Sequence, residues 1–280
     1  MKNSQLSITH IGGPTALLEF GGLRLLTDLT FDPAGGEYRS GPAMLRKLSG
    51  PALSPEAVGA FDYVLLSHAH HFDNLDRSGR ALLENAKTVL TTREGAKRLG
   101  GNSLGLQPWQ GVDLQTAQGQ VLRVISAPAR HGPEGLSQGE VTGFIIFFAD
   151  NPEQAIYFSG DTVWYQGVSE VAKRFPVRVA LLNLGAARVP EVGNFHLTMT
   201  ASEAVQAANE FSSALIIPLH FEGRAHFSGG AGGYCRGLCR CCRGPSAMAG
   251  TWPGDCGCAI GAHVKKLSCC RTRQSIRSAR

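Results

Sequence analysis

One stretch of the sequence gathers residue types that can bind a metal ion. Between Val64 and Asp76, an apolar run gives way to three histidines and two aspartates, which are His68, His70, His71, Asp73 and Asp76. Imidazole nitrogen and carboxylate oxygen are ligands that suit zinc and similar divalent cations. We therefore predict that this stretch supplies part of a catalytic metal site.

Three further apolar stretches, each with the pattern of a strand, also lead to a residue that can bind metal. These residues are His131, Asp161 and His220. Because strand ends meet at one edge of a sheet, we expect the four segments to converge there. A catalytic zinc ion usually has three protein ligands and a position open to water, and a pair of metal ions shares a bridging carboxylate. The converging residues therefore suffice for one or two ions.

The assignment of ligands leaves one choice open. The ligands of a first ion are predicted to be His68, His131 and one of the adjacent pair His70 and His71. The ligands of a second ion are predicted to be Asp73, His220 and a bridging Asp161. Zinc is the expected ion, with manganese and iron(II) as alternatives, because nitrogen and oxygen ligands suit all three.

The strands that position these residues follow from the alternation of apolar residues. Glycine turns separate the first three, which predicts an antiparallel meander over residues 6–11, 15–20 and 23–28. The run over residues 61–67 is almost entirely apolar, as expected for a strand covered on both faces. Further strands are predicted over residues 88–92, 122–127, 141–148, 155–159, 178–184 and 214–220.

Segments with helical spacing lie between many of these strands. Residues 29–59 are rich in proline, glycine and serine, and we predict one short helix there, around residues 43–47. Thr200 to Glu203 has the form of a capping box that opens a helix extending to about residue 211. Other helices are predicted over residues 77–86, 93–99 and 168–175. This alternation of strands and helices predicts two sheets with helices outside them.

Composition divides the chain near residue 228. All eight cysteines of the 280 residues lie beyond that point, at Cys235 and after it. Nine of the 27 Lys and Arg residues but one of the 22 acidic residues lie from Gly229 onward, so the net charge is about −3 before it and +8 after it. We predict a globular domain over residues 1–228 and a Cys- and Arg-rich tail over residues 229–280. The acidic domain lacks a basic stripe, so we expect no nucleic-acid partner.

The tail does not have the ligand spacing of a regular zinc-binding motif, although it contains Cys-x3-Cys-x-Cys-Cys and Cys-x-Cys. We interpret it as the product of a reading-frame slip after about Phe227, because TGC cysteine codons shifted by one base read as alanine codons. On this hypothesis the tail is disordered and a helix that would pack on the domain is missing. Sequencing the gene tests the idea, which is lost if no alternative frame continues the domain.

The sequence has no sign of a membrane or secretion segment. No apolar run approaches the roughly 18 to 20 residues of a membrane span, and the first residues lack the apolar region of a signal peptide. We therefore expect a cytoplasmic protein with no membrane span that acts on a small-molecule substrate. A homo-oligomer is compatible with the sequence.

Taken together, the motifs resemble those of the metallo-β-lactamase superfamily. They are TDLTFDP, LLSHAHHFDNLD, APARHGP, YFSGDTVW and IPLHFEG, and the resemblance covers about residues 6–227. Within the superfamily they look closest to the branch with ascorbate-6-phosphate lactonase-like and N-acyl-phosphatidylethanolamine phospholipase D-like proteins. The resemblance implies an α/β fold, a four-layer αβ/βα sandwich of two mixed β-sheets flanked by helices.

The resemblance also implies an activity. It makes the chain a metal-dependent hydrolase in which a metal-bound hydroxide attacks an ester, lactone or phosphodiester bond, with Asp73 orienting the nucleophile. Asp28 matches an aspartate that supports the site, and His196 is a further catalytic candidate that could face the substrate. His226 and Arg224 are candidates for lining the cleft.

The chain departs from the family pattern at two positions. One additional residue separates the first two histidines, so His70 and His71 compete for one role, and Asn74 stands where the family has a ligand histidine. The count of metal ions, one or two, therefore stays open. Two other functions are compatible with these departures: a metal-binding or sensor protein of the same fold with weakened catalysis, and a nuclease, against which the acidic domain argues.

Overall fold

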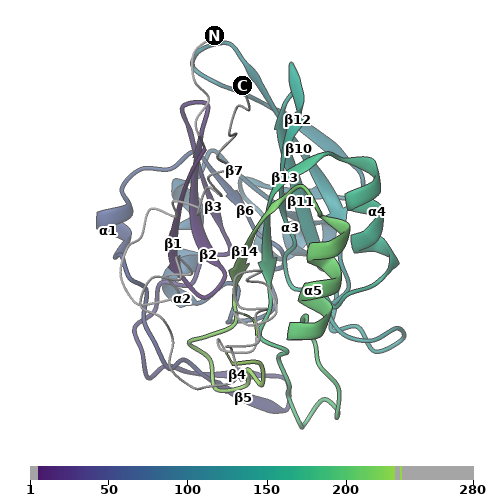
Figure 1. Cartoon of the computed structure of the whole chain (residues 1–280). Helices are drawn as coiled ribbons and strands as arrows, with labels where there is room; N and C mark the ends of the chain where they lie inside the picture. Colours follow the sequence, from purple (N-terminus) through teal and green to yellow (C-terminus); the bar gives the residue numbers. More distant parts are fainter. Residues whose placement is uncertain (1–5, 231–233, 235–280) are drawn as a thin grey trace, which may run out of the picture.

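The computed structural model describes residues 6–230 and Tyr234 of the chain. Two six-stranded sheets face each other, and helices lie on the outer side of each (Figure 1). The predictions of a disordered tail and of a frame slip concern residues that lie almost entirely outside the described part. Tyr234 lies beyond the predicted domain boundary but is fully buried, and its hydroxyl donates to the carbonyl of Met199.

The first sheet has the order β1-β2-β3-β6-β7-β8. Its strands are β1 Ser7–Gly12, β2 Thr15–Phe20, β3 Leu23–Thr27, β6 Tyr63–Leu65, β7 Thr88–Thr92 and β8 Ser103–Leu106. The predicted meander is present, because β1, β2 and β3 pair antiparallel. The pairs from β3 to β8 are parallel, so this sheet is mixed.

The second sheet has the order β14-β13-β12-β11-β10-β9. Its strands are β9 Gly111–Gln115, β10 Val121–Pro128, β11 Thr142–Phe148, β12 Asn151–Phe158, β13 Val177–Asn183 and β14 Leu215–Leu219. The pairs from β9 to β12 are antiparallel, and β12, β13 and β14 are parallel. This sheet is therefore mixed as well.

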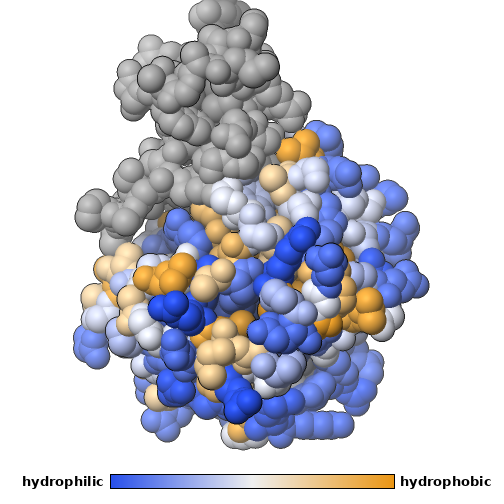
Figure 2. Space-filling model, turned by 90° about the horizontal axis from the view of Figure 1, so that it is seen from below, coloured by the Kyte–Doolittle hydropathy of each residue, from blue (hydrophilic) through white to orange (hydrophobic). Residues whose placement is uncertain are grey.

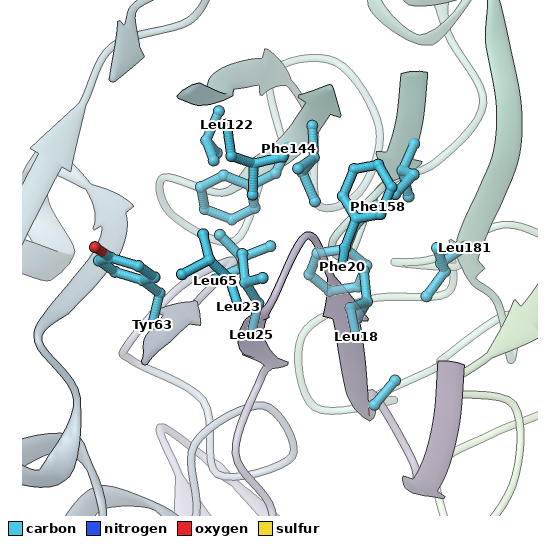
Figure 3. Close-up of a cluster of buried hydrophobic side chains, with 14 of the residues drawn as sticks. Leu18, Phe20, Leu23, Leu25, Tyr63, Leu65, Leu122, Phe144, Phe158 and Leu181 are labelled. Carbon is cyan, nitrogen blue, oxygen red and sulfur yellow. The ribbon is translucent and has the colours of Figure 1, made fainter. Parts of the chain in front are cut away.

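The central strands are apolar on both faces because each face packs against a different layer. In β11, Phe144 and Ile146 belong to the core between the sheets, whereas Ile145 and Phe147 pack toward the helices outside. Figure 3 shows the core between the sheets, where Leu18, Phe20 and Leu65 come from one sheet and Leu122, Phe144 and Phe158 from the other. Alternation between two buried faces explains the almost continuous apolar runs.

Helices complete the outer layers. They are α1 Pro55–Val58, α2 Arg77–Ala81, the 3-10 turn η1 Leu83–Asn85, α3 Arg93–Leu99, α4 Gln166–Arg174 and α5 Ala201–Glu210. Val58 of α1 packs with Val64 of β6, and Val168 of α4 packs with Ile145. The predicted αβ/βα sandwich is therefore confirmed. Among the described residues, no helix is both long enough and apolar enough to cross a membrane.

The prediction of a helix around residues 43–47 is wrong. Glu37–Ser40 and Ala43–Arg46 form a two-stranded hairpin, β4 and β5, in which Tyr38 lies directly opposite Leu45. Both side chains are buried, and they pack against the segment that follows β13. Tertiary packing of this hairpin overrides the local helical preference. The predicted helix over residues 77–86 is also shorter, because it divides into α2 and η1.

The carboxylate of Asp76 joins this hairpin to the stretch that carries the histidines. Asp76 is the N-cap of α2, as its place at a helix start predicts, and its Oδ1 accepts from the backbone N–H of Gly79 at 2.9 Å. Oδ2 accepts from the Nζ of Lys47, next to the end of β5, at 2.9 Å, and both side chains are almost completely buried. The backbone N–H groups of Phe31 and Asp32 donate to the same carboxylate.

We expect Asp76→Asn to lower the free energy of unfolding by about 3–5 kcal/mol, because it leaves the ammonium of Lys47 buried without its anion. Urea titration followed by far-UV circular dichroism measures the change. Asp113→Asn is the matched control, since it makes the same chemical change in an exposed pair with Arg123 and should have little effect. An Asp76→Asn loss no larger than that of the control contradicts the structural role of the pair.

Candidate metal centre

The predicted ligands converge from both sheets. His68 follows β6 in the first sheet, whereas His131, Asp161 and His220 follow β10, β12 and β14 in the second. All four are buried, with exposed fractions of 3% or less. His220 has a φ of 53°, an uncommon backbone conformation for a residue with a side chain, and such residues cluster at functional sites.

Three groups of these side chains bring their ligand atoms within 4.8 Å of one another. One group is His68, His131 and Asp161, and another is Asp73, Asp161 and His220. The third group is His68, His70 and His71. Asp161 belongs to two groups, which is the position that a bridging carboxylate would take. The arrangement has room for both histidines of the adjacent pair, so geometry alone leaves the choice between them open.

A chain of hydrogen bonds fixes the ring of His68. The Oγ of Ser67 donates to Asp28 Oδ2 at 2.8 Å and lies 2.9 Å from His68 Nδ1. Since the hydroxyl proton of Ser67 is used on Asp28, Nδ1–H of His68 donates to Oγ, and Nε2 keeps its lone pair. The backbone N–H of Ser67 donates to Asp28 Oδ1 at 2.7 Å. Asp28 thus supports the site by orienting His68 through Ser67.

Carbonyl oxygens fix two more rings in the same way. His131 Nδ1 lies 3.0 Å from the carbonyl of Leu197, and His70 Nε2 lies 2.7 Å from that of Gln138. A carbonyl only accepts, so each of these nitrogens carries the proton. The free lone pairs are then on Nε2 of His131 and Nδ1 of His70. Metal-binding histidines are commonly oriented by a hydrogen bond of this kind on the other ring nitrogen.

Two buried atoms, Asp161 Oδ2 and His220 Nε2, indicate whether a cation fits here. His220 Nδ1 lies 3.0 Å from Asp161 Oδ1, which also accepts from the Nδ2 of Asn183 at 2.8 Å. Among the described residues, neither Asp161 Oδ2 nor His220 Nε2 has a hydrogen-bond partner. Buried polar atoms are nearly always paired. A carboxylate oxygen and an imidazole nitrogen are ligand types that suit a divalent cation, so the residues fit a metal ion.

Burial keeps the histidines on the first-sheet side neutral. Burial, followed by the neighbouring rings of His71 and His70, holds the pKa of His68 well below its usual value. Burial and the nearby His131 lower the pKa of His71 to about 3. Only a neutral imidazole can bind a metal ion. These rings are therefore in the binding form throughout the neutral pH range.

The carboxylates differ in their preferred charge. Burial would raise the pKa of Asp73, but the hydrogen bond from His226 and the charge of His226 hold it well below its usual range. The pKa of Asp161 is likewise lowered against the effect of burial, by His220. Burial and the charge of Asp161 raise the pKa of Asp28 to about 7. Asp73 and Asp161 are therefore the anions of the cluster.

His226 is a close partner of Asp73. Its Nε2 lies 3.0 Å from Asp73 Oδ2, whereas His220 Nε2 is 3.9 Å from the same oxygen. The sequence marks His226 as a candidate for lining the cleft but not as a partner of Asp73. The two residues are 153 positions apart, and only the fold brings the segment after β14 back to the histidine stretch.

Asn74 stands where the resemblance implies a ligand histidine, and in the fold its amide contacts Asp28 and Ser67. Its Nδ2 donates to Asp28 Oδ2 at 2.8 Å and lies 3.4 Å from the Oγ of Ser67. The amide therefore reinforces the carboxylate that orients His68. The second group of ligands is left with Asp73, Asp161 and His220.

Two other candidates have structural partners. His196 Nε2 lies 3.2 Å from Glu203 Oε1, and Glu203 is the capping-box residue of α5. The predicted capping box is thus present, and the His196 ring is turned toward it. The guanidinium of Arg224 is buried, and its Nη2 donates to the carbonyl of Phe72 at 3.1 Å.

A cavity of about 130 Å³ opens beside the centre. At one end it is bordered by His71, Asp73, His131 and His226. The β4–β5 hairpin, Gln138 and the segment from Ala187 to Leu197 form the remaining walls. A concave space that combines apolar walls with a few polar groups is typical of a site for a small molecule.

Comparison with known sequences agrees with this architecture. The family described as "Beta-lactamase superfamily domain" matches residues 24–221. A Mycobacterium tuberculosis protein is 29% identical over 231 residues, which are 78% of this chain and 59% of the relative. A UPF0173 metal-dependent hydrolase of an Exiguobacterium species is 26% identical over 223 residues, 78% of this chain and 86% of the relative. The chain spans less than two thirds of the mycobacterial relative.

Solved structures share the fold. An isothiocyanate hydrolase from Delia radicum gut bacteria superimposes with a TM-score of 0.67 at 20% identity, covering 82% of this chain and 90% of that one. A possible metal-dependent hydrolase from Veillonella parvula gives 0.66 at 19% identity, covering 83% and 91%. With the family match over most of the described residues, these findings confirm that the chain belongs to the metallo-β-lactamase superfamily.

Proposed function

We propose that this chain is a metal-dependent hydrolase that cleaves an ester, lactone or phosphodiester bond of a small molecule. The observation that carries the proposal is the convergence of buried histidines and aspartates in which Asp161 Oδ2 and His220 Nε2 are left without a partner among the described residues. Relatives named as metal-dependent hydrolases support it. The narrower resemblance to the lactonase-like and phospholipase D-like branch stays a prediction.

We assign the ligands by the groups that the fold brings together. His68, His131 and Asp161 would hold a first ion, with His70 or His71 as a further ligand, and Asp73, Asp161 and His220 would hold a second. Zinc is the proposed ion, because the first group would offer it two or three imidazole nitrogens and one carboxylate, which are ligands typical of zinc sites. When bound, a divalent cation lowers the pKa of a water molecule to about 7 and polarises the bond to be cleaved.

The proposed role of Asp73 is to orient the attacking water. Its carboxylate is charged at neutral pH, borders the cavity and can accept a hydrogen bond from a water molecule there. His226 holds the carboxylate in place through the 3.0 Å hydrogen bond to Oδ2. We propose His226 as the positioning residue of Asp73. The ring of His196 contacts Glu203, which lies in the first turn of α5. The role that we propose for His196 in the reaction is therefore indirect, through the position of α5.

We expect His131→Ala and Asp161→Ala to abolish hydrolysis, because each removes a ligand from the first group. The loss in kcat/KM should exceed the roughly 10- to 100-fold cost of losing a residue that only orients a ligand. Metal analysis of the purified variants, beside their activity, separates loss of the ion from misfolding. Activity retained in either variant overturns the ligand assignment.

Removal of the metal with a chelator should abolish hydrolysis and lower the melting temperature, because an ion bound to the folded state alone stabilises it. Re-addition of zinc should restore both properties. Titration with zinc, read as equivalents bound per chain, distinguishes a single occupied group from two. Undiminished hydrolysis by metal-free protein contradicts a metal-dependent reaction.

We expect His226→Gln to lower kcat by about 10- to 100-fold, because Asp73 loses the hydrogen bond that orients it. His196→Gln should have a smaller effect, since its partner Glu203 lies at the start of α5 and not at the cavity. The split between kcat and KM is the informative measurement, and an equal or larger loss in His196→Gln contradicts the role given to His226.

A further inference from the structure

Away from the proposed metal ligands, the cavity is bordered mainly by apolar residues, together with the uncharged polar residues Ser40 and Gln138. Leu45 of the hairpin packs with Val189 and Leu197 of the segment after β13 in one cluster, and all three border the cavity. Pro42 and Val192 extend the same surface. A substrate that reaches the ligands therefore places the rest of its atoms against hydrocarbon and uncharged polar groups.

Cations are kept out of this space. Among the described residues that border the cavity, none is Lys or Arg. The two buried cations among the described residues are already engaged: Lys47 Nζ pairs with Asp76 at 2.9 Å, and Arg224 Nη2 donates to the carbonyl of Phe72. Arg224 Nη1 has no partner among the described residues, but Arg224 borders a separate small recess beside Gly12 and Gly13 and not the cavity.

A charged substituent would therefore be poorly solvated in the cavity. Burying an ionised group without a partner is costly, and apolar walls supply none. Seen from the β4–β5 end, strongly hydrophilic residues lie among separate hydrophobic ones on the surface (Figure 2). Beyond the proposed metal ligands and His226, the residues that border the cavity carry no charge.

The size of the cavity limits what it can enclose. About 130 Å³ is close to the roughly 150 Å³ of an engineered apolar cavity that binds benzene. One ring or a short branched chain fills such a volume. A larger substrate would have to extend past the hairpin into solvent.

We infer that the substrate, outside the group that reaches the metal ligands, is compact and uncharged, and that an anionic substituent beside the reacting bond disfavours cleavage. This inference rests on the proposed hydrolysis and adds to it the class of substituent that the substrate carries. It depends on the apolar lining and on the absence of Lys and Arg from it among the described residues, and both can be changed by substitution.

A matched pair of esters tests the inference on the zinc-loaded protein. The 4-acetoxyphenyl methyl sulfone is neutral, and 4-acetoxybenzenesulfonate carries a negative charge at the same position. We expect kcat/KM for the neutral ester to be at least ~10-fold higher, a difference of about 1.4 kcal/mol. Equal or faster cleavage of the sulfonate overturns the inference.

A substitution at Val192 tests whether the apolar wall causes the preference. Val192 is half-buried and borders the cavity, so a lysine there can direct its ammonium to the rim. Val192→Lys should reduce the ratio of neutral to anionic kcat/KM by about 10-fold. Val192→Met is the matched control of similar length without charge and should leave the ratio unchanged, whatever happens to the absolute rates. A ratio that is the same in both variants contradicts the role of the wall.

Failure of the proposed function can be separated from failure of this inference. If the zinc-loaded protein cleaves none of the esters, the proposed hydrolysis of such bonds is contradicted. Binding then decides the inference: phenyl methyl sulfone should raise the melting temperature more than benzenesulfonate at equal concentration. A shift with benzenesulfonate that is as large or larger overturns it.

Discussion

Burial of the charged Asp73 and Asp161 at the end of two packed sheets is the constraint on which the centre depends. An isolated buried carboxylate is strongly unfavourable, and here each is compensated by a histidine: His226 for Asp73 and His220 for Asp161. The compensation is incomplete, because Asp161 Oδ2 and His220 Nε2 have no partner among the described residues. A divalent cation satisfies both atoms at once, which explains why such costly residues are gathered in one place.

The scaffold around the centre rests on a second buried charge. Asp76 closes the histidine stretch, caps α2 and binds Lys47 at the base of the hairpin. The hairpin contributes Leu45 and its neighbours to the cavity wall. One carboxylate therefore joins the hairpin that borders the cavity to the stretch that carries the histidines, although it does not itself border the cavity. Because the ion pair is buried, removal of either Asp76 or Lys47 would leave the other charge without a partner.

The sequence predicts the parts of the molecule that obey local rules. Strand runs, the capping box at Thr200 and the ligand residues at strand ends follow from periodicity and residue type, and the family motifs supply the sandwich. The hairpin at residues 37–46 is missed because Tyr38 and Leu45 meet only through tertiary packing. The contact of His226 with Asp73 is missed for the same reason, since no periodicity links residues 153 positions apart.

The structure shows which contacts Asn74 makes at the position where the sequence departs from the family pattern. The sequence indicates only that a ligand histidine is absent there. In the fold, Asn74 donates to the same Asp28 carboxylate that orients His68 through Ser67. The burial of Asp28, with a pKa of about 7, makes such a donor valuable, because each hydrogen bond favours the charged carboxylate. On the proposed ligand assignment, Asn74 adds no ligand to the group of Asp73 and His220, and its amide instead supports the group that contains His68. The two groups are unequal: hydrogen bonds orient two histidine rings, His68 and His131, in one group, whereas the other has a single histidine, His220, and both share Asp161.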